Sequence, residues 1–177
     1  MSGLRESSAE LALREITEAN RAEVEQLRVR PDQDTFVDGV VSSLAEASAT
    51  PASNPWYRAI YAGDTPVGFV MIANDVPAQD KVIRRRYYLW RMLIDSRYQG
   101  RGYGRAALNR LIEYLRTRPG ADELVTSVVP GEGSPLSFYL RYGFETTGEW
   151  FDHEQVLRLP LNAEPARRNP IVGPLAD

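Results

Sequence analysis

A glycine-rich hexapeptide, Gln99-Gly100-Arg101-Gly102-Tyr103-Gly104, has the clearest chemical signature in this chain of 177 residues. Glycine lets the backbone turn sharply and approach a ligand closely. A helix is predicted to begin at this turn, and the first N–H groups of a helix lack partners within the helix and favour negative charge. Arg101 and Arg105 add positive charge. The segment therefore predicts a site for a diphosphate.

The spacing of the glycines separates this site from two better-known phosphate sites. Glycines at 100, 102 and 104 do not form the G-x-G-x-x-G pattern of dinucleotide-binding enzymes. The chain also lacks the G-x-x-x-x-G-K-[ST] pattern of nucleoside-triphosphate sites. A nucleotide-dependent oxidoreductase and a P-loop enzyme are both disfavoured, whereas a plain glycine-rich turn remains an alternative if the hexapeptide is taken alone.

Composition excludes several other chemistries. The chain has no cysteine and one histidine, His153, so neither a disulfide nor a cysteine nucleophile is available, and we expect no metal site. The formal net charge of −3 provides no basic field for nucleic acid. No apolar run has the length of a membrane span, and Met1–Glu10 does not resemble a secretory signal. We expect a cytoplasmic protein without membrane or nucleic-acid partners.

Strand and helix patterns follow one another along the chain and would position the turn. Apolar alternation predicts strands, and apolar residues three and four apart predict helices. In chain order we predict a strand through Leu11, Leu13 and Ile16; a helix from a Thr17 cap through Ala22, Val24 and Leu27; a helix with Phe36, Val37, Val40, Val41 and Leu44 on one face; strands over Trp56–Ala62, Val67–Ala73 and Tyr87–Asp95; a helix through Ala107, Leu108, Leu111, Ile112 and Leu115; a strand over Leu124–Val129; a helix over Pro135–Arg141; and strands near Phe144–Trp150 and Glu154–Leu159.

This order predicts a mixed α/β sheet with helices on both faces. No linker interrupts the chain, so we predict one domain over residues 1–177, with residues 1–9 and 160–177 as loosely ordered tails.

A second motif strengthens the interpretation of the first. Phe138-Tyr139-Leu140-Arg141-Tyr142-Gly143-Phe144 follows the glycine-rich turn after one predicted helix and one predicted strand. With Tyr98–Gly104, in which Gln99, Gly102 and Gly104 fill a Gln/Arg-x-x-Gly-x-Gly/Ala signature, it makes the chain resemble the GCN5-related N-acetyltransferases. The resemblance covers about Leu11–Leu159, and within the family it is nearest to bacterial spermine/spermidine-type acetyltransferases.

The resemblance implies a fold, a cofactor and a reaction. The fold is a mostly antiparallel sheet whose two central strands splay apart, and the co-substrate is acetyl-CoA. The backbone of Leu93 and Ile94 would bind the pantetheine arm and the thioester oxygen, and the segment from Gln99 to Arg105 would bind the diphosphate. Tyr139 fills the position of the general acid, and a phenol is protonated at neutral pH. The acceptor would be the primary amine of a small molecule, such as a polyamine, attacking directly in a ternary complex.

Three points stay open at the level of sequence. The strand Tyr87–Ile94 carries no acid, so Asp95, Glu132, Asp152 and Glu154 are all candidates for a base and none is chosen. Asp95 can equally cap the turn that follows it. A non-catalytic acyl-CoA sensor and a protein N-terminal or lysine acetyltransferase are alternatives on the same fold. A homodimer is common in the family, and nothing in the sequence decides it.

Three further features of the sequence bear on the site. Many relatives carry Asn where this chain has Gly133, and Ser134 is the residue that would replace the lost contact. Arg84-Arg85-Arg86 is interpreted as a solvated strand edge. A set of aromatic residues is interpreted as core rather than as an amine pocket. This set comprises Trp56, Tyr57, Tyr87, Tyr88, Trp90 and Trp150.

Overall fold

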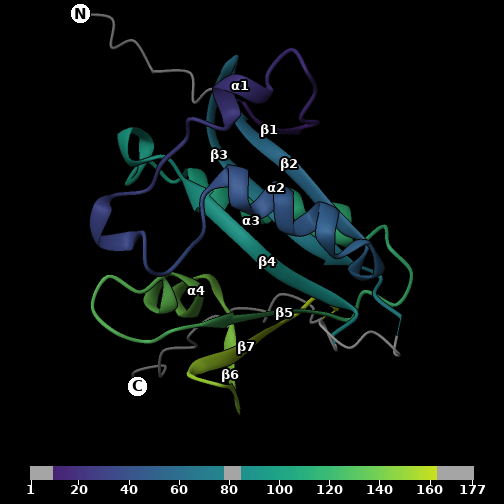
Figure 1. Cartoon of the computed structure of the whole chain (residues 1–177). Coiled ribbons are helices and arrows are strands. Elements are labelled where there is room, and N and C mark those ends of the chain that lie inside the picture. The colour runs from purple at the N-terminus through teal and green to yellow at the C-terminus, as the bar shows by residue number, and fades with distance from the viewer. Residues whose placement is uncertain (1–9, 78–84, 163–177) are drawn as a thin grey trace, which may run out of the picture.

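Seven strands form one sheet in a computed structural model that describes residues 10–77 and 85–162. The strand order is β1-β2-β3-β4-β5-β7-β6, and every neighbouring pair is antiparallel except β4 and β5 (Figure 1). The strands are β1 Leu11–Arg14, β2 Pro55–Ala62, β3 Thr65–Asn74, β4 Tyr87–Ile94, β5 Glu123–Val128, β6 Glu145–Phe151 and β7 Glu154–Pro160. The predicted mixed, mostly antiparallel sheet is confirmed.

Helices cover both faces of this sheet, as predicted. The α-helices are α1 Arg21–Val24, α2 Val40–Ala49, α3 Tyr103–Leu115 and α4 Leu136–Tyr142. Short 3-10 turns are η1 Pro31–Gln33, η2 Pro51–Ser53 and η3 Ser96–Tyr98. Within residues 10–77 and 85–162, no helix has the length and apolar character needed to cross a membrane.

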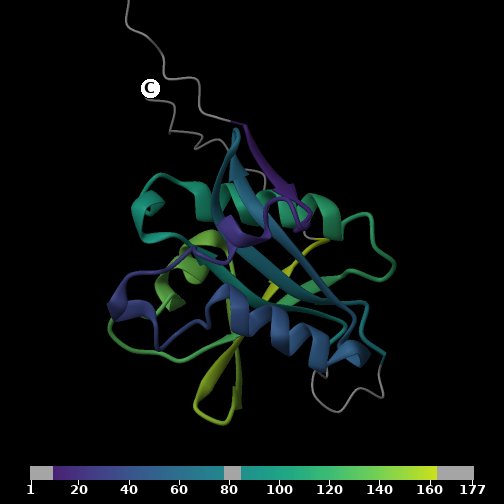
Figure 2. The same cartoon turned by 45° about the horizontal axis from the view of Figure 1, so that its top comes forward.

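Alternation along the central strands divides the core into two layers. Figures 1 and 2 show α2 on one face of the sheet and α3 on the other. From β3, Phe69 and Met71 pack in the cluster that includes α2, whereas Val70 and Ile72 pack in the cluster that includes α3. Successive side chains of a strand point to opposite faces, so one strand supplies both layers. Complete burial of each such side chain contributes about 1.5–3 kcal/mol.

The parallel pair β4 and β5 diverges soon after it begins. Its ladder holds a single register pair, Tyr88 with Val125. One side-chain bond continues the contact, from Thr126 Oγ1 to the carbonyl of Leu89 at 3.0 Å. The rest of β4 pairs with β3 alone, up to Ile94. The predicted splay of the central strands is therefore present, and it leaves one edge of β4 open for a ligand.

The first two helices begin later than the sequence predicts. Asn20 accepts the N–H of Thr17 at 2.8 Å and donates to the carbonyl of Glu15 at 3.0 Å, which holds this stretch as a turn before α1. The second helix does not include Phe36 and Val37, because the extended backbone of Gly39 precedes its first turn. Both predictions were wrong because the apolar spacing was outweighed, before α1 by local polar bonds and before α2 by a glycine.

The C-terminal tail also begins later than predicted. Pro160 belongs to β7, and the N–H of Leu161 donates to the carbonyl of Asp122 at 2.8 Å. The side chain of Leu161 is buried in the core beside α3. The prediction of a loose tail from residue 160 is thus wrong for these two residues, and residues 1–9 and 163–177 lie outside the described ranges.

Candidate active site

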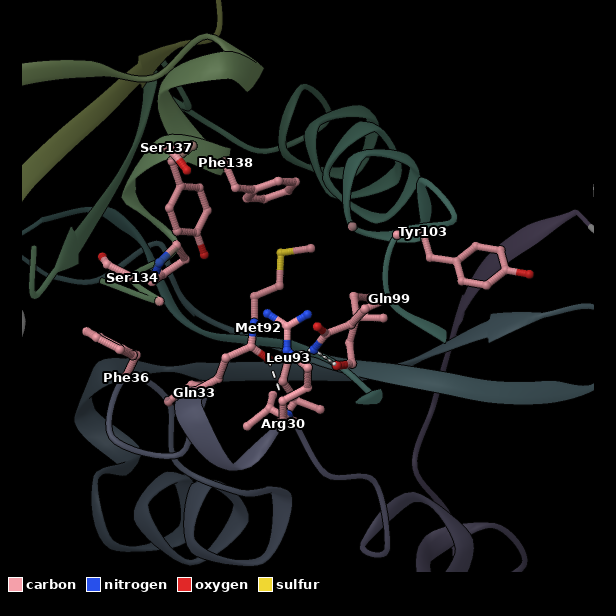
Figure 3. A pocket seen from close by; sticks show the side chains of 18 of the residues that line it. Arg30, Gln33, Phe36, Met92, Leu93, Gln99, Tyr103, Ser134, Ser137 and Phe138 are labelled. Carbon is pink, nitrogen blue, oxygen red and sulfur yellow. Dashed lines mark hydrogen bonds between the residues drawn. The ribbon is translucent and has the colours of Figure 1, made fainter. Parts of the chain in front are cut away.

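A cavity of about 670 Å³ lies at the open edge of β4. Its walls come from β4, the start of α3, α4 and a segment before α2 that we call the 29–37 segment (Figure 3). The side chain of Met92 points into the cavity, with Phe138 on the opposite wall. Arg30, Gln33 and Phe36 form the wall contributed by the 29–37 segment. Four separate parts of the chain therefore meet around one space.

The glycine-rich turn forms one end of this cavity. Gly100 and Gly102 have φ angles of +75° and +82°, and an added Cβ at either would meet no atom within 4 Å. Gly102 caps α3, and the first bond of the helix runs from the N–H of Ala106 to the carbonyl of Gly102 at 3.0 Å. Among the described residues, the N–H groups of 103–105 have no protein acceptor. This open, donor-rich turn fits a diphosphate.

The cavity brings together all but one of the residues predicted to bind the cofactor. The residues in its wall are Leu93, Ile94, Gln99, Gly100, Gly102, Tyr103, Gly104 and Arg105. Arg101 is not in the wall: its guanidinium donates to the carbonyl of Arg97 at 3.3 Å and lies over the ring of Tyr98. Tyr103 contributes backbone alone, because its side chain points away from the cavity (Figure 3).

Gln99 braces the turn with its side chain. Its Nε2 donates to Gln33 Oε1 at 2.7 Å and to the carbonyl of Ile94 at 2.9 Å. Both amide hydrogens are thus taken by protein acceptors. The bond to Ile94 also shows that this carbonyl faces the open edge of β4. Gln99 therefore joins three walls of the cavity: the turn, β4 and the 29–37 segment.

Gly104 allows α3 and α4 to approach each other across the cavity. A Cβ at Gly104 would lie 3.2 Å from Phe138 Cζ and 3.3 Å from its Cε2. Such distances are shorter than ordinary van der Waals contact, so a larger side chain would displace Phe138. The Gly/Ala position of the signature is thus explained by the packing of the second motif against the first.

Tyr139 has the environment of an acid that stays protonated. Its ring is 6% exposed and makes edge-on contacts with Phe138 and Phe144. Burial, with a smaller contribution from Tyr88, raises the pKa of the Tyr139 phenol far above its ordinary value. No hydrogen bond among the described residues uses the hydroxyl. The phenol therefore holds its proton and has no competing acceptor in this part of the protein.

Asp95 is a structural residue rather than a base. Its carboxylate accepts the N–H of Arg97 at 3.0 Å, the N–H of Arg28 at 2.9 Å and the Nε of Arg97 at 2.8 Å. Burial acts to raise its pKa, but these bonds outweigh burial and hold the pKa below its ordinary value. The capping interpretation of Asp95 is confirmed, and its lone pairs are committed to η3 and to the loop after α1.

The missing asparagine has a steric explanation. Gly133 has a φ of +80°, and a Cβ there would lie 3.3 Å from the carbonyl oxygen of Asp32 and 3.4 Å from the ring of Phe36. The 29–37 segment therefore occupies the space that a larger side chain would need. Ser134 donates to the carbonyl of Val129 at 2.6 Å and accepts the N–H of Leu136 at 3.3 Å. Its hydroxyl stabilises the turn before α4.

A second cavity, of about 230 Å³, also has Tyr139 in its wall. The two cavities share the wall residues Phe36, Val37, Met92, Pro135 and Tyr139. Carboxylates of the second cavity come from Asp34, Asp38 and Glu154, and its one lining guanidinium among the described residues is that of Arg91. Arg91 Nη2 is bonded to Asp38 at 2.7 Å and to Glu46 at 2.8 Å. The charge left uncompensated in this cavity is negative.

The aromatic residues divide between core and cavity. Tyr88 and Trp90 line the second cavity, so interpreting them as core alone was wrong; the splay of β4 from β5 exposes them. Trp56 stacks on Tyr114 with ring centroids 4.3 Å apart, and the buried Tyr87 donates its hydroxyl to the carbonyl of Pro119, as expected of core residues. Trp150 is exposed.

The arginine cluster before β4 behaves as a solvated edge where it is described. Arg85 pairs with Glu149, and Arg86 Nε lies 2.6 Å from Asp75. Arg84 lies outside the described ranges. Within those ranges no group of three or more His, Asp or Glu side chains could hold a metal ion.

The 29–37 segment is the part of the site that sequence reasoning missed. Arg30, Gln33, Phe36 and Val37 lie far from both motifs in the chain but line the cavities. The available signal was the pair of breakers, Pro31 and Gly39, which isolates a short stretch with apolar residues but no room for a full helix. Met92 and Arg141 also line the first cavity without having been predicted.

Comparison with known proteins identifies the family of this chain. A model of the acetyltransferase (GNAT) family matches residues 13–144. The chain is 29% identical over 146 residues to the spermine/spermidine N(1)-acetyltransferase of Bacillus subtilis (strain 168), which covers 82% of this chain and 95% of the relative.

Solved structures share the fold at lower identity. An acetyltransferase from Thermus thermophilus has a TM-score of 0.64 and 20% identity over 86% of this chain and 99% of its own. The aminoglycoside acetyltransferase AAC(6')-Ib, solved with coenzyme A, has a TM-score of 0.67 and 16% identity over 85% of this chain and 95% of its own. Because the family match spans well over half of the sequence, the chain belongs to the acetyltransferase (GNAT) family and is an acetyl-CoA-dependent N-acetyltransferase.

Proposed function

We propose that this enzyme acetylates a primary amine of a small, multiply charged cation such as a polyamine, by direct attack within a ternary complex. The observation that carries the proposal is the position of Tyr139 in the wall shared by the two cavities. Acetyl-CoA would occupy the larger cavity and the amine the smaller one. The phenol would then lie at the boundary where the thioester and the amine meet.

On the acetyl-CoA side, the backbone would do most of the binding. The N–H groups at the start of α3 and the open turn at Gly100 and Gly102 would hold the diphosphate, with Arg105 beside it. The backbone of Leu93 and Ile94, at the open edge of β4, would hold the pantetheine arm and the thioester oxygen. A fixed N–H aimed at an oxygen that gains negative charge lowers the barrier to acyl transfer.

Tyr139 would complete the reaction by protonating the leaving thiolate. Its raised pKa means that the phenol is protonated at neutral pH, which is the form that can donate to the leaving sulfur. The aromatic rings of Phe138 and Phe144 fix the phenol from two sides. Such fixing reduces the reorganisation that the transfer would otherwise require.

On the amine side, charge and shape favour a cation with more than one ammonium group. Asp34 and Glu154 line the second cavity with no ion-pair partner among the described residues, and Trp90 offers an aromatic face. Carboxylates attract ammonium groups, and an indole face adds a cation–π contact. The relative from Bacillus subtilis is named for spermine and spermidine, which have this chemistry.

A thiol-release assay over a panel of acceptors tests the proposal. The panel holds spermine, spermidine, a short diamine, an aminoglycoside, an amino acid and a lysine peptide. We expect the highest kcat/KM with the polyamines. If acetyl-CoA binds by calorimetry and no amine in the panel is acetylated, the proposal fails.

A pair of charge variants tests the acceptor cavity itself. Asp34→Asn should raise KM for a polyamine by about two- to fivefold, the size expected of one exposed ion pair, and the effect should shrink at high salt. Asp64→Asn makes the same change of charge in the β2–β3 turn, where the side chain is fully exposed. Equal KM values for the two variants would contradict the placement of the amine.

A further inference from the structure

We propose that Glu154, acting through Ser127 and Tyr88, accepts the proton that the acceptor ammonium must lose before it can attack. This inference rests on the proposed function and adds the residue that removes the proton, which the sequence left open. All three side chains line the second cavity, where the amine would bind. Tyr88 would contact the ammonium, whereas Ser127 and Glu154 act through it.

The hydrogen bonds of the three residues form a directed chain. The hydroxyl of Ser127 donates to Glu154 Oε2. Because a serine hydroxyl has one hydrogen, the bond of 2.5 Å between Tyr88 Oη and Ser127 Oγ must be donated by Tyr88. The phenol oxygen of Tyr88 then keeps its lone pairs for a donor in the cavity. An ammonium N–H is such a donor.

Three adjacent strands position the chain at the point where the sheet opens. Tyr88 stands on β4 at its one ladder pair with β5, opposite Val125. Ser127 lies two residues further along β5 and therefore on the same face as Val125. Glu154 is the first residue of β7, which pairs with β5 through Ser127 and Val156. The splay that admits the amine is thus adjacent to the chain that would take its proton.

The basic side chains around the second cavity are bonded to carboxylates other than that of Glu154. Within the described residues, no arginine or histidine forms an ion pair with Glu154. The charged and titratable groups around this cavity are Asp34 and Asp38 from the segment before α2, Arg91 from β4, Tyr139 from α4 and His153 from the β6–β7 turn. Arg91 is bonded to Asp38 and Glu46, and His153 to Asp152 at 3.0 Å.

The ionisation of Tyr88 is consistent with a relay. Burial raises the pKa of its phenol; the bond to Ser127 opposes this rise, and the nearby carboxylate of Glu154 adds to it. Tyr88 is therefore neutral at neutral pH, as a residue must be if it passes a proton on without holding a charge.

The proton balance of the step is complete. One N–H bond of the ammonium breaks as its proton binds Tyr88 Oη; the phenol proton moves to Ser127 Oγ, and the serine proton moves to the Glu154 carboxylate. Glu154 then releases a proton to solvent. The freed amine attacks the carbonyl carbon, the C–S bond breaks, and Tyr139 protonates the sulfur. Tyr139 regains a proton from the nitrogen that has become an amide.

The variants Glu154→Gln and Ser127→Ala, assayed with a polyamine between pH 7 and 10, test the relay. Each should lower kcat at pH 7 by about 100-fold, the low end of what a general base contributes. The deficit should shrink as pH rises, because the free amine then forms without help. The double variant should be no slower than the slower single variant, since both act on one path. Tyr88→Phe should behave in the same way.

Controls separate this inference from its alternatives. Glu145→Gln, an exposed acid on β6 of the same hairpin, should leave kcat unchanged. A Glu154→Gln enzyme with a raised KM for the amine and an unchanged kcat would show a mere cation anchor and overturn the relay; so would a deficit that stays constant with pH.

Two further controls guard against misleading results. If Glu154→Gln loses affinity for acetyl-CoA, Ser127→Ala decides the matter, because it removes one hydroxyl and keeps the carboxylate. If the wild-type enzyme acetylates no amine, it is the proposed function that fails, not the relay alone.

Discussion

The side-chain amide of Gln99 lies 2.7 Å from that of Gln33, although 66 residues separate them in the chain. This bond ties the glycine-rich turn to the 29–37 segment, which no sequence motif connects. The same amide nitrogen holds the carbonyl of Ile94 at the open edge of β4. The proposed acetyl-CoA site is therefore braced from a part of the chain that carries neither family motif.

We predict that Gln33→Ala loosens this brace. The variant removes the acceptor and leaves Gln99 with Ile94 alone, so unfolding in urea should show a loss of about 1 kcal/mol. Calorimetry should also show weaker binding of acetyl-CoA, because a loosened turn must be ordered again on binding. The effect should be at most about fivefold, the change in an equilibrium constant that corresponds to about 1 kcal/mol. The double variant Gln33→Ala/Gln99→Ala should lose less free energy of unfolding than the sum of the losses in the two single variants. Fully additive losses would mean that the two amides act independently.

Gly102 and Gly148 offer a matched pair for testing the turn. Their φ angles are +82° and +81°, and a Cβ at either would meet no atom within 4 Å. Alanine at each should therefore cost a similar strain of about 1–2 kcal/mol. Gly102→Ala should also weaken acetyl-CoA binding by about tenfold, about 1.4 kcal/mol, because its methyl group enters the proposed diphosphate site.

Gly148 lies in β6, away from both cavities, and Gly148→Ala should leave the affinity for acetyl-CoA unchanged. If both variants lose affinity equally, strain rather than the ligand site explains the effect of Gly102→Ala.

Tyr139→Phe tests the acid. It should lower kcat by about 100-fold or more while acetyl-CoA affinity changes little, since the ring remains and the hydroxyl makes no bond among the described residues. An unchanged kcat would remove Tyr139 from the acid role.

The raised pKa of Tyr139 adds a prediction about stability. Above a pH of about 10 the unfolded chain loses phenol protons that the folded chain keeps, so the free energy of unfolding falls as pH rises. Below that pH this contribution is fully present. In Tyr139→Phe the decline above pH 10 should be shallower, as urea titrations at several pH values would show. An identical slope would mean that the phenol is not shielded from solvent.

Asp95→Asn should weaken the fold but not the proton chemistry. Replacing a buried carboxylate that accepts four N–H hydrogen bonds should cost about 1–3 kcal/mol at pH 7. Because the folded pKa of Asp95 is lowered, its stabilisation is present above its ordinary pKa of 3.8 and is lost as pH falls through the folded value.

Urea unfolding between pH 3 and 7 should therefore show that the free energy of unfolding falls less steeply toward low pH in Asp95→Asn than in the wild-type enzyme. The exposed Asp64→Asn serves as the control. The pH profile of kcat/KM should keep its shape. A shifted profile would assign Asp95 to the proton path.

The local parts of this enzyme could be predicted from sequence because residue type directly limits the backbone there. Gly100 and Gly102 have the positive φ angles that glycine permits, and α3 begins at the residue after Gly102, with the predicted apolar stripe buried. The aromatic motif around Tyr139 lies on α4, with Gly143 ending the helix at a φ of +130°. Each of these features depends on neighbours within a few residues.

The tertiary structure decided what depends on distant register and packing. Apolar spacing alone cannot tell a helix face from the wall of a cavity, so it places Phe36 on α2 although this residue lines the space beside Tyr139. Tyr88, Ser127 and Glu154 meet because β4, β5 and β7 pair in one register and then diverge. No propensity encodes that divergence, since it arises from how strands far apart in the sequence twist and pack against α2 and α3.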